Sequence, residues 1–140
     1  MFPIKVNDCI RNLFVEGKKC IVNADLDGIL SGMLLQRFLN WKVVGYSSCC
    51  GKPDDELWMA DTSERIKDCI FVDLPMWIPS IATIDQHFIA FEKDSIDDYF
   101  KNNNKINPNA IRGRVFKTSN GRCEYTGKYP FGTVHLLVCF

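Results

Sequence analysis

The sequence predicts an α/β fold with an open, mainly parallel, Rossmann-like sheet and helices on both of its faces. Short apolar runs of strand length recur along the chain, and segments with helical periodicity lie between several of them. Carboxylates directly follow three of these apolar runs. Strands that are apolar throughout are typical of parallel sheets covered on both faces. A length of 140 residues suits one such domain.

Two helices in the first third of the chain are predicted from the spacing of their apolar residues. Val6–Glu16 carries apolar side chains three or four positions apart, and the following glycine ends the pattern. Ile29–Trp41 has an apolar face formed by Leu30, Leu34 and Phe38. Each helix is expected to cover the sheet with its apolar face.

Four strands are predicted from runs of β-branched and other apolar residues: Cys20–Val22, Val43–Tyr46, Ile70–Val72 and Ile81–Ile84. Prolines at positions 75 and 79 exclude a long helix between the last two strands. Residues 94–127 are polar and poorly periodic, so we expect loops with short elements there, including a hairpin turn at positions 119–121.

A last helix is predicted to begin near Pro130. Its apolar run continues to Phe140 without a glycine, a proline or a polar stop. A domain seldom ends inside an apolar element, so we expect the domain to be incomplete at its C-terminus.

Composition excludes several functional classes. Lys and Arg number 17, as do Asp and Glu, so a strongly basic nucleic-acid wrap or a polybasic membrane anchor is excluded as the main activity. No apolar run approaches the ~18–20 residues of a membrane span, and the first residues lack a signal-peptide layout, so we expect a cytoplasmic protein without membrane contact.

Seven cysteines are many for this length, but none forms a Cys-x-x-Cys pair. Cys20, Cys69 and Cys139 lie in apolar segments and are expected to be buried thiols. The adjacent Cys49 and Cys50 lack the two further ligands that a zinc site needs, which favours structural thiols over metal ligands.

Polar residues at three predicted strand ends carry the candidate chemistry. Asp25 and Asp27 follow the first strand, Asp73 follows the third, and Asp85 and His87 follow the fourth. The carboxyl ends of parallel strands meet at one edge of a sheet, so these groups are expected to converge. Gathered carboxylates repel one another unless cations lie between them, and oxygen-rich sites with one histidine favour Mn²⁺ or Mg²⁺. The pattern predicts metal-assisted phosphoester hydrolysis with one or two ions.

Each part also has a purely structural interpretation. An Asp-x-Asp-Gly segment is common in turns, and an aspartate after a strand can cap the next element. His87, which precedes Phe88 and Ile89, can be a half-buried packing residue, and His135 is expected to pack on its own helix. The order and spacing of the groups together favour a site over these separate interpretations.

The same residues resemble the DHH phosphoesterase superfamily. Residues 20–32 are similar to its first motif and Phe71–Leu74 to its second, and Ile84–His87 occupies the place of its Asp-His-His motif. Asn107-Pro108 and residues 128–133 are similar to the later segment that leads into the next helix. The resemblance extends over residues 19–140.

The resemblance implies a DHH-type catalytic domain over residues 1–140, without the family's separate substrate-binding domain. It implies Mn²⁺ (or Mg²⁺) ligands at Asp25, Asp27 and Asp73, with Asp73 bridging two ions and holding the attacking water. Gln86 stands at the position of a metal-binding histidine and is a weaker ligand. His87 would face the scissile phosphate, and Asp85 would support it.

The implied substrate is a phosphodiester of single-stranded nucleic acid or a small nucleotide. The predicted substrate contacts are Asn23, His87, Arg112 and Arg114, since the two arginines belong to the one local excess of positive charge. Aromatic side chains that could stack on bases are Trp58, Trp77, Tyr99 and Phe100, although packing in the core or on the surface is favoured for each. Two alternatives stay open: a catalytically degenerate nucleotide or nucleic-acid binding module, and a pyrophosphatase-like hydrolase of a small anion.

Overall fold

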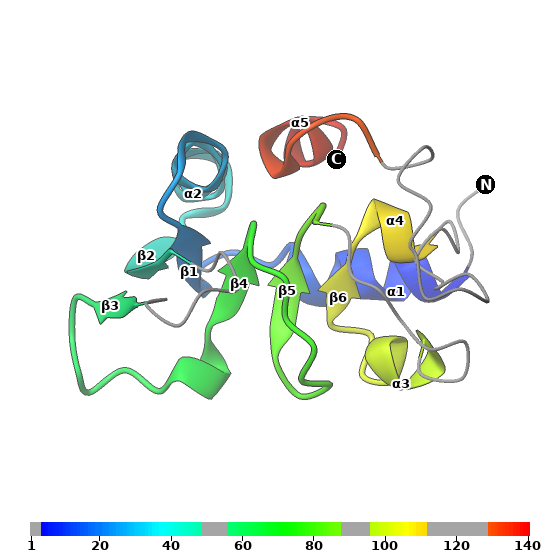
Figure 1. Cartoon of the computed structure of the whole chain (residues 1–140), viewed down its shortest axis with the longest axis horizontal. Coiled ribbons are helices and arrows are strands. Elements are labelled where there is room, and N and C mark those ends of the chain that lie inside the picture. Colours follow the sequence, from blue (N-terminus) through cyan, green and yellow to red (C-terminus); the bar gives the residue numbers. More distant parts are fainter. Residues whose placement is uncertain (1–3, 49–55, 88–95, 112–128) are drawn as a thin grey trace, which may run out of the picture.

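The computed structural model describes residues 4–48, 56–87, 96–111 and 129–140 (Figure 1). Its helices are α1 (Ile4–Leu13), α2 (Leu26–Leu39), α3 (Ile96–Phe100), α4 (Pro108–Ile111) and α5 (Thr133–Val138), with one 3₁₀ turn, η1 (Ile66–Asp68). Its strands are β1 (Lys19–Asn23), β2 (Lys42–Ser47), β3 (Leu57–Met59), β4 (Ile70–Val72), β5 (Ala82–Ile84) and β6 (Lys105–Ile106).

The strands form one six-stranded sheet in the order β3-β2-β1-β4-β5-β6. Every neighbouring pair is parallel except β2 and β3, which are antiparallel. The predicted α/β class and the mainly parallel sheet are confirmed. The strands β3 and β6 were not predicted, because three and two residues are too short for a period to show.

The order of the strands reverses at β1. The chain passes from β1 to β2 on one side, and later returns to β4 on the other side. In open α/β sheets, ligands bind beyond the carboxyl ends of the strands at such a switch point. The carboxyl ends of β1 and β4 therefore mark the place where a site is expected.

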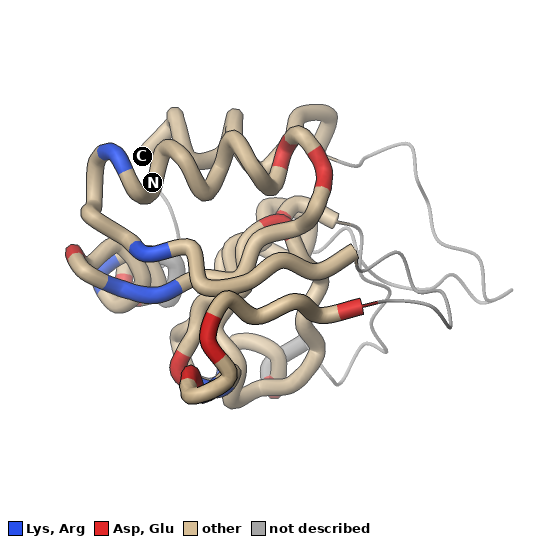
Figure 2. The backbone as a smooth tube through the Cα atoms, turned by 90° about the vertical axis from the view of Figure 1, so that its left-hand side faces the viewer, with Lys and Arg blue, Asp and Glu red and all other residues tan. Residues whose placement is uncertain are grey.

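Two cores lie on opposite faces of the sheet. Buried residues of α1, α2 and α5 share one core with alternate residues of the central strands, among them Val22 and Val72. The other core holds Ile21, Phe71 and Leu74 with the chain between β3 and β5. Figure 2 shows α2 lying above the strands, with the chain that follows β3 below them.

Helices lie on both faces of the sheet, but unevenly. The short α3 lies on the second face, where its Tyr99 ring is 5.1 Å from the Lys105 ammonium group. Lys105 is buried and donates to the carbonyl oxygen of Ile78, which precedes β5. Burial lowers the pKa of Lys105 to about 8.

Several predicted boundaries shift by a few residues. The last helix begins at Thr133 rather than near Pro130, and α2 ends at Leu39, before Asn40 in the left-handed region. Cys20 and Cys69 are buried as predicted, whereas Cys139 is exposed, because it follows α5 on the solvent side. The cysteine pair at 49–50 and the hairpin turn at 119–121 lie outside the described residues.

No helix in the described ranges is both long and apolar enough to cross a bilayer.

The tight passage from β1 into α2 depends on Gly28. A Cβ atom at this position would overlap the carbonyl oxygen of Asn23, the last residue of β1. Because the obstacle is backbone, relief requires the strand and the helix to move apart. Gly28 thus holds the end of β1 against the first turn of α2.

We expect Gly28→Ala to lower the free energy of unfolding by about 2 kcal/mol, despite the higher helix propensity of alanine. Urea denaturation followed by circular dichroism measures this change. Gln36→Ala, on the exposed side of the same helix, is the control and should stay within about 0.5 kcal/mol of the wild type. Equal stability of the two variants would contradict the close approach.

Candidate metal centre

Asp73 follows β4 directly and is fully buried. Its φ of 59° lies in the left-handed region, which aspartate tolerates better than most residues. Its backbone N–H donates to the carbonyl oxygen of Ile84, which continues the ladder to β5. The carboxylate accepts from Thr133 Oγ1 at 2.7 Å and from Asn23 Nδ2 at 3.3 Å. Three segments far apart in sequence therefore meet at this side chain.

Asp85 and His87 lie at the end of the neighbouring strand β5. Asp85 is buried, and its Oδ1 accepts from His87 Nδ1 at 2.7 Å. Asn107 Nδ2 donates to Asp85 Oδ2 at 3.2 Å and to the backbone oxygen of His87 at 2.9 Å. These contacts fix the imidazole ring, which is about one third exposed (34%).

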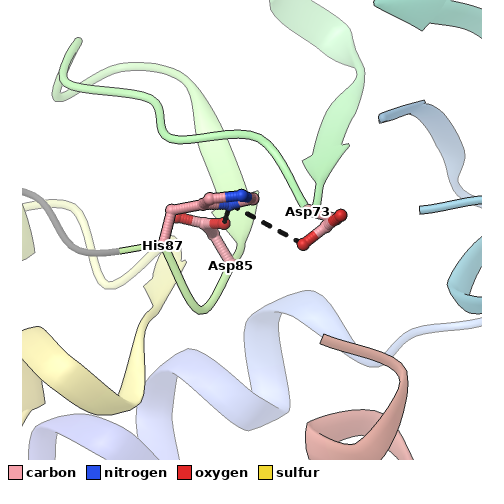
Figure 3. Close-up of side chains that lie close together, drawn as sticks. All are labelled: Asp73, Asp85 and His87. Carbon is pink, nitrogen blue, oxygen red and sulfur yellow. Dashed lines mark hydrogen bonds and ion pairs between the residues drawn. The ribbon is translucent and has the colours of Figure 1, made fainter. Parts of the chain in front are cut away.

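Asp73, Asp85 and His87 form a compact group of potential ligands (Figure 3). One ligand atom of each residue lies within 4.8 Å of the others, and His87 Nδ1 is 3.7 Å from Asp73 Oδ1. Two carboxylates and one imidazole suit a divalent cation, so this group could hold a metal ion. The convergence of the β4 and β5 carboxylates with the histidine was predicted from the strand ends.

The surroundings of Asp73 disfavour the ionised form of its carboxyl group. Burial, with a smaller contribution from the negative charges of Asp27 and Asp25, raises the pKa of Asp73 to about 7. The Thr133 hydrogen bond and His87 act in the opposite direction. A strongly shifted carboxyl group at a strand end is typical of a functional site, because a bound cation would remove the cost of its charge.

Asp25 and Asp27 lie next to this group but are engaged as helix caps. Asp25 Oδ1 accepts from the Gly28 N–H at 2.9 Å at the start of α2, and its Oδ2 accepts from Asn23 Nδ2 at 2.9 Å. Asp27 accepts from the backbone N–H groups of Thr133 and Val134, at 2.7 and 2.8 Å, at the start of α5. The two aspartates of the Asp-x-Asp-Gly segment therefore cap helices, as its structural interpretation expected.

Both aspartates are nevertheless linked to Asp73 through a shared neighbour. Asn23 donates to Asp25 and Asp73, and Thr133 donates to Asp27 and Asp73. A Cβ atom on Gly132 would overlap the Asp27 carboxylate, so the loop before α5 also packs against this rim. The four predicted carboxylates are thus gathered at one edge of the sheet.

The remaining predicted site residues have different positions. Gln86 is half-buried, and its backbone oxygen accepts from Asn109 Nδ2 at 2.6 Å. Arg112 and Arg114 lie outside the described residues. Of the four aromatic residues weighed for base stacking, Tyr99 is buried and Phe100 is half-buried against it, as the packing interpretation expected, whereas Trp58 and Trp77 are exposed.

Sequence reasoning assigned no role at the site to Asn107, Asn109 or Thr133. All three are fully buried and direct a polar group to the site residues or their backbone. The sequence offers one signal for them: Asn107 and Asn109 flank a proline, and Thr133 lies at the start of a helix. That signal does not name a partner, because the partners lie 20 or more residues away.

No family model, curated protein or solved structure matches the chain.

The raised pKa of Asp73 gives its charge a measurable effect on stability. Between about pH 4 and pH 7 the folded chain binds more protons at this position than the unfolded chain does. The free energy of unfolding should therefore fall as the pH rises through this window, by up to about 4 kcal/mol from this group.

Asp73→Asn keeps the shape and tolerates the left-handed backbone, but does not titrate. We expect its stability relative to the wild type to rise by a few kcal/mol between pH 4 and pH 7.5, measured by urea denaturation with EDTA present. Any lost hydrogen bond adds only a constant offset. Asp98→Asn, an exposed change of the same kind, should parallel the wild type at every pH. A stability difference between Asp73→Asn and the wild type that stays constant with pH would contradict the raised pKa of Asp73.

Proposed function

We propose that this protein is a metal-dependent phosphoesterase of the DHH type, built on a Rossmann-like sheet, that hydrolyses a phosphodiester. One observation carries the proposal: ligand atoms of Asp73, Asp85 and His87 lie within 4.8 Å of one another at the carboxyl edge of a mainly parallel sheet. These residues belong to the second and third motifs of the resemblance, in the expected order.

The charge distribution supports a need for cations. Asp25, Asp27, Asp73 and Asp85 gather at the carboxyl edge of the sheet, while Lys19 and Lys42 begin β1 and β2 at the opposite edge. Such a rim would repel a phosphate on its own. A divalent cation bound there would neutralise phosphoryl charge and lower the pKa of water, which is the chemistry that phosphoester hydrolysis needs.

The residues themselves supply positioning and proton transfer. Asp73, Asp85 and His87 would hold the ion, with Mn²⁺ or Mg²⁺ the best match to an oxygen-rich set. Without an ion, the contact between Asp85 Oδ1 and His87 Nδ1 holds the plane of the imidazole ring. Thr133 and Asn23 orient the Asp73 carboxylate.

The function is tested with Mn²⁺ calorimetry and with hydrolysis of bis(4-nitrophenyl) phosphate by the whole protein. We expect Mn²⁺-dependent turnover in the wild type, a loss of at least about 100-fold in Asp73→Asn, and no change in Asp98→Asn. Hydrolysis of inorganic pyrophosphate is measured in parallel, and turnover of pyrophosphate without turnover of the phosphodiester would favour the pyrophosphatase-like alternative. Equal rates for the wild type and Asp73→Asn would remove the proposal.

A second candidate function is a nucleotide or nucleic-acid binding module without turnover. The observation that favours it is the capping role of Asp25 and Asp27, whose oxygens already accept hydrogen bonds from α2 and α5. Together with an amide at position 86, this leaves fewer free ligands for a second ion than the family has.

Gln86→His restores the imidazole of the family motif and separates the two candidates. In a degenerate module, we expect this change to raise Mn²⁺ affinity by about tenfold or more, because imidazole is a better ligand than an amide oxygen. Calorimetry measures the affinity, and Gln36→His on the exposed side of α2 is the matched control. Tight binding of two Mn²⁺ ions by the wild type would contradict the binding-only candidate.

A further inference from the structure

The outward side of α2 is apolar although it faces solvent. The charged residues of this helix are Asp27 and Arg37, in its first and last turns. Leu26 is 73% exposed, Leu30 is 38% exposed and Met33 is 60% exposed. In Figure 1, α2 packs on the sheet and beside α5, and no described element lies over its outward side. A helix that is apolar all round is typically buried, so a partner is expected to cover this side.

The apolar surface continues from α2 to the end of α5. Leu30, Leu34 and Phe38 are four positions apart, so they follow one another along one row of the helix surface. Phe38 borders an apolar groove of about 510 Å³ between α1, α2 and α5, which Val138 and Phe140 also line. The row thus joins the outward side of α2 to this groove.

The exposed area of this surface is close to that of one side of a protein interface. It comes from six side chains: Leu26, Leu30, Met33, Phe38, Val138 and Phe140. With roughly 200 Å² for a fully exposed large side chain, their exposed fractions amount to about 700 Å². A stable interface buries about 800 Å² on each partner, and most monomers expose smaller apolar patches. The surface is therefore large enough to bind a protein.

The residue pattern of this side favours a second copy of the chain as that protein. The outward stripe has spacings of four, three and four positions, which are the same in both directions: Leu26, Leu30, Met33 and Arg37. These are also the spacings of a short coiled-coil seam. If two α2 helices pack antiparallel, Leu30 of each copy faces Met33 of the other copy. The stripe is thus complementary to itself, which a symmetric interface requires.

The charges at the two ends of α2 are also complementary in such a pair. Arg37 is exposed and forms no ion pair with the described residues. Asp25 and Asp27 lie at the other end of the helix, on either side of Leu26. An antiparallel pair brings Arg37 of one copy to these carboxylates of the other copy, and it aligns the helix dipoles favourably. A parallel pair would bring like charges together.

We propose that the outward side of α2 is the interface of a homodimer, in which the two α2 helices pack antiparallel about a two-fold axis between positions 31 and 32. Leu26 of each copy would face Arg37 of the other copy. Because Phe38 is the neighbour of Arg37, the apolar groove lies next to this contact and can accept apolar side chains of the second copy. The proposal does not rest on the proposed phosphoesterase function.

Sedimentation velocity of the whole protein in EDTA, between about 1 and 100 µM, measures the association. We expect the wild type to form a species of twice the mass of one chain. Met33→Glu places a charge from each copy in the seam and should raise the dissociation constant of the dimer by at least about 100-fold. Gln36→Glu adds the same charge to the same helix outside the stripe. This control should stay within about threefold of the wild type.

Charge-swapped chains test the antiparallel pairing. Leu30→Glu and Met33→Lys should each be monomeric alone. A mixture of the two should dimerise, because position 30 of one chain then faces the opposite charge at position 33 of the other. Both substituted side chains are exposed, and circular dichroism with thermal melting confirms that each variant is folded.

Three results would overturn the proposed homodimer. The first is a wild type that stays monomeric at every concentration, which would point to a different protein as the partner of this surface. The second is a dimer that Met33→Glu leaves intact, since its interface would then lie elsewhere. The third is a mixture of the charge-swapped chains that stays monomeric, which would exclude the antiparallel pairing.

Discussion

The constraint on which the site depends is a carboxylate that is fully buried at the end of a central strand. Asp73 has no exposed surface, and burial raises its pKa to about 7. A charged group in such a place needs hydrogen-bond donors or a cation. Asn23 of β1 and Thr133 of α5 supply these donors. The side chain of Asp73 therefore joins β1 and α5 at the end of β4.

This arrangement gives the neighbouring carboxylates two roles that compete. Asp25 and Asp27 stabilise the starts of α2 and α5 by accepting from backbone N–H groups of these helices, and the same oxygens would be needed if either aspartate bound an ion. Capping contributes about 1 kcal/mol per helix. Binding of an additional ion by Asp27 would have to replace its contacts with α5.

The sequence was sufficient to predict the strands that bear the site, because Cys20–Val22, Ile70–Val72 and Ile81–Ile84 are apolar runs followed by acids. It could not predict β3 or β6, whose pairing is decided by the sheet edge and not by their own few residues. Nor could it assign partners to Thr133 and Asn107, since their hydrogen bonds join segments that only the folded topology brings together. The capping of α5 by Asp27 crosses 106 positions and leaves no local pattern.

The long reach of that last contact has a consequence for how the protein is made. Asp25, Asp27 and Asp73 emerge from the ribosome well before Thr133, which follows Asp27 by 106 positions and Asp73 by 60. Until α5 docks, the acidic rim lacks the threonine and the two amide groups that complete it. The nascent chain thus carries an unfinished cluster of negative charge until α5 has been synthesised and has docked.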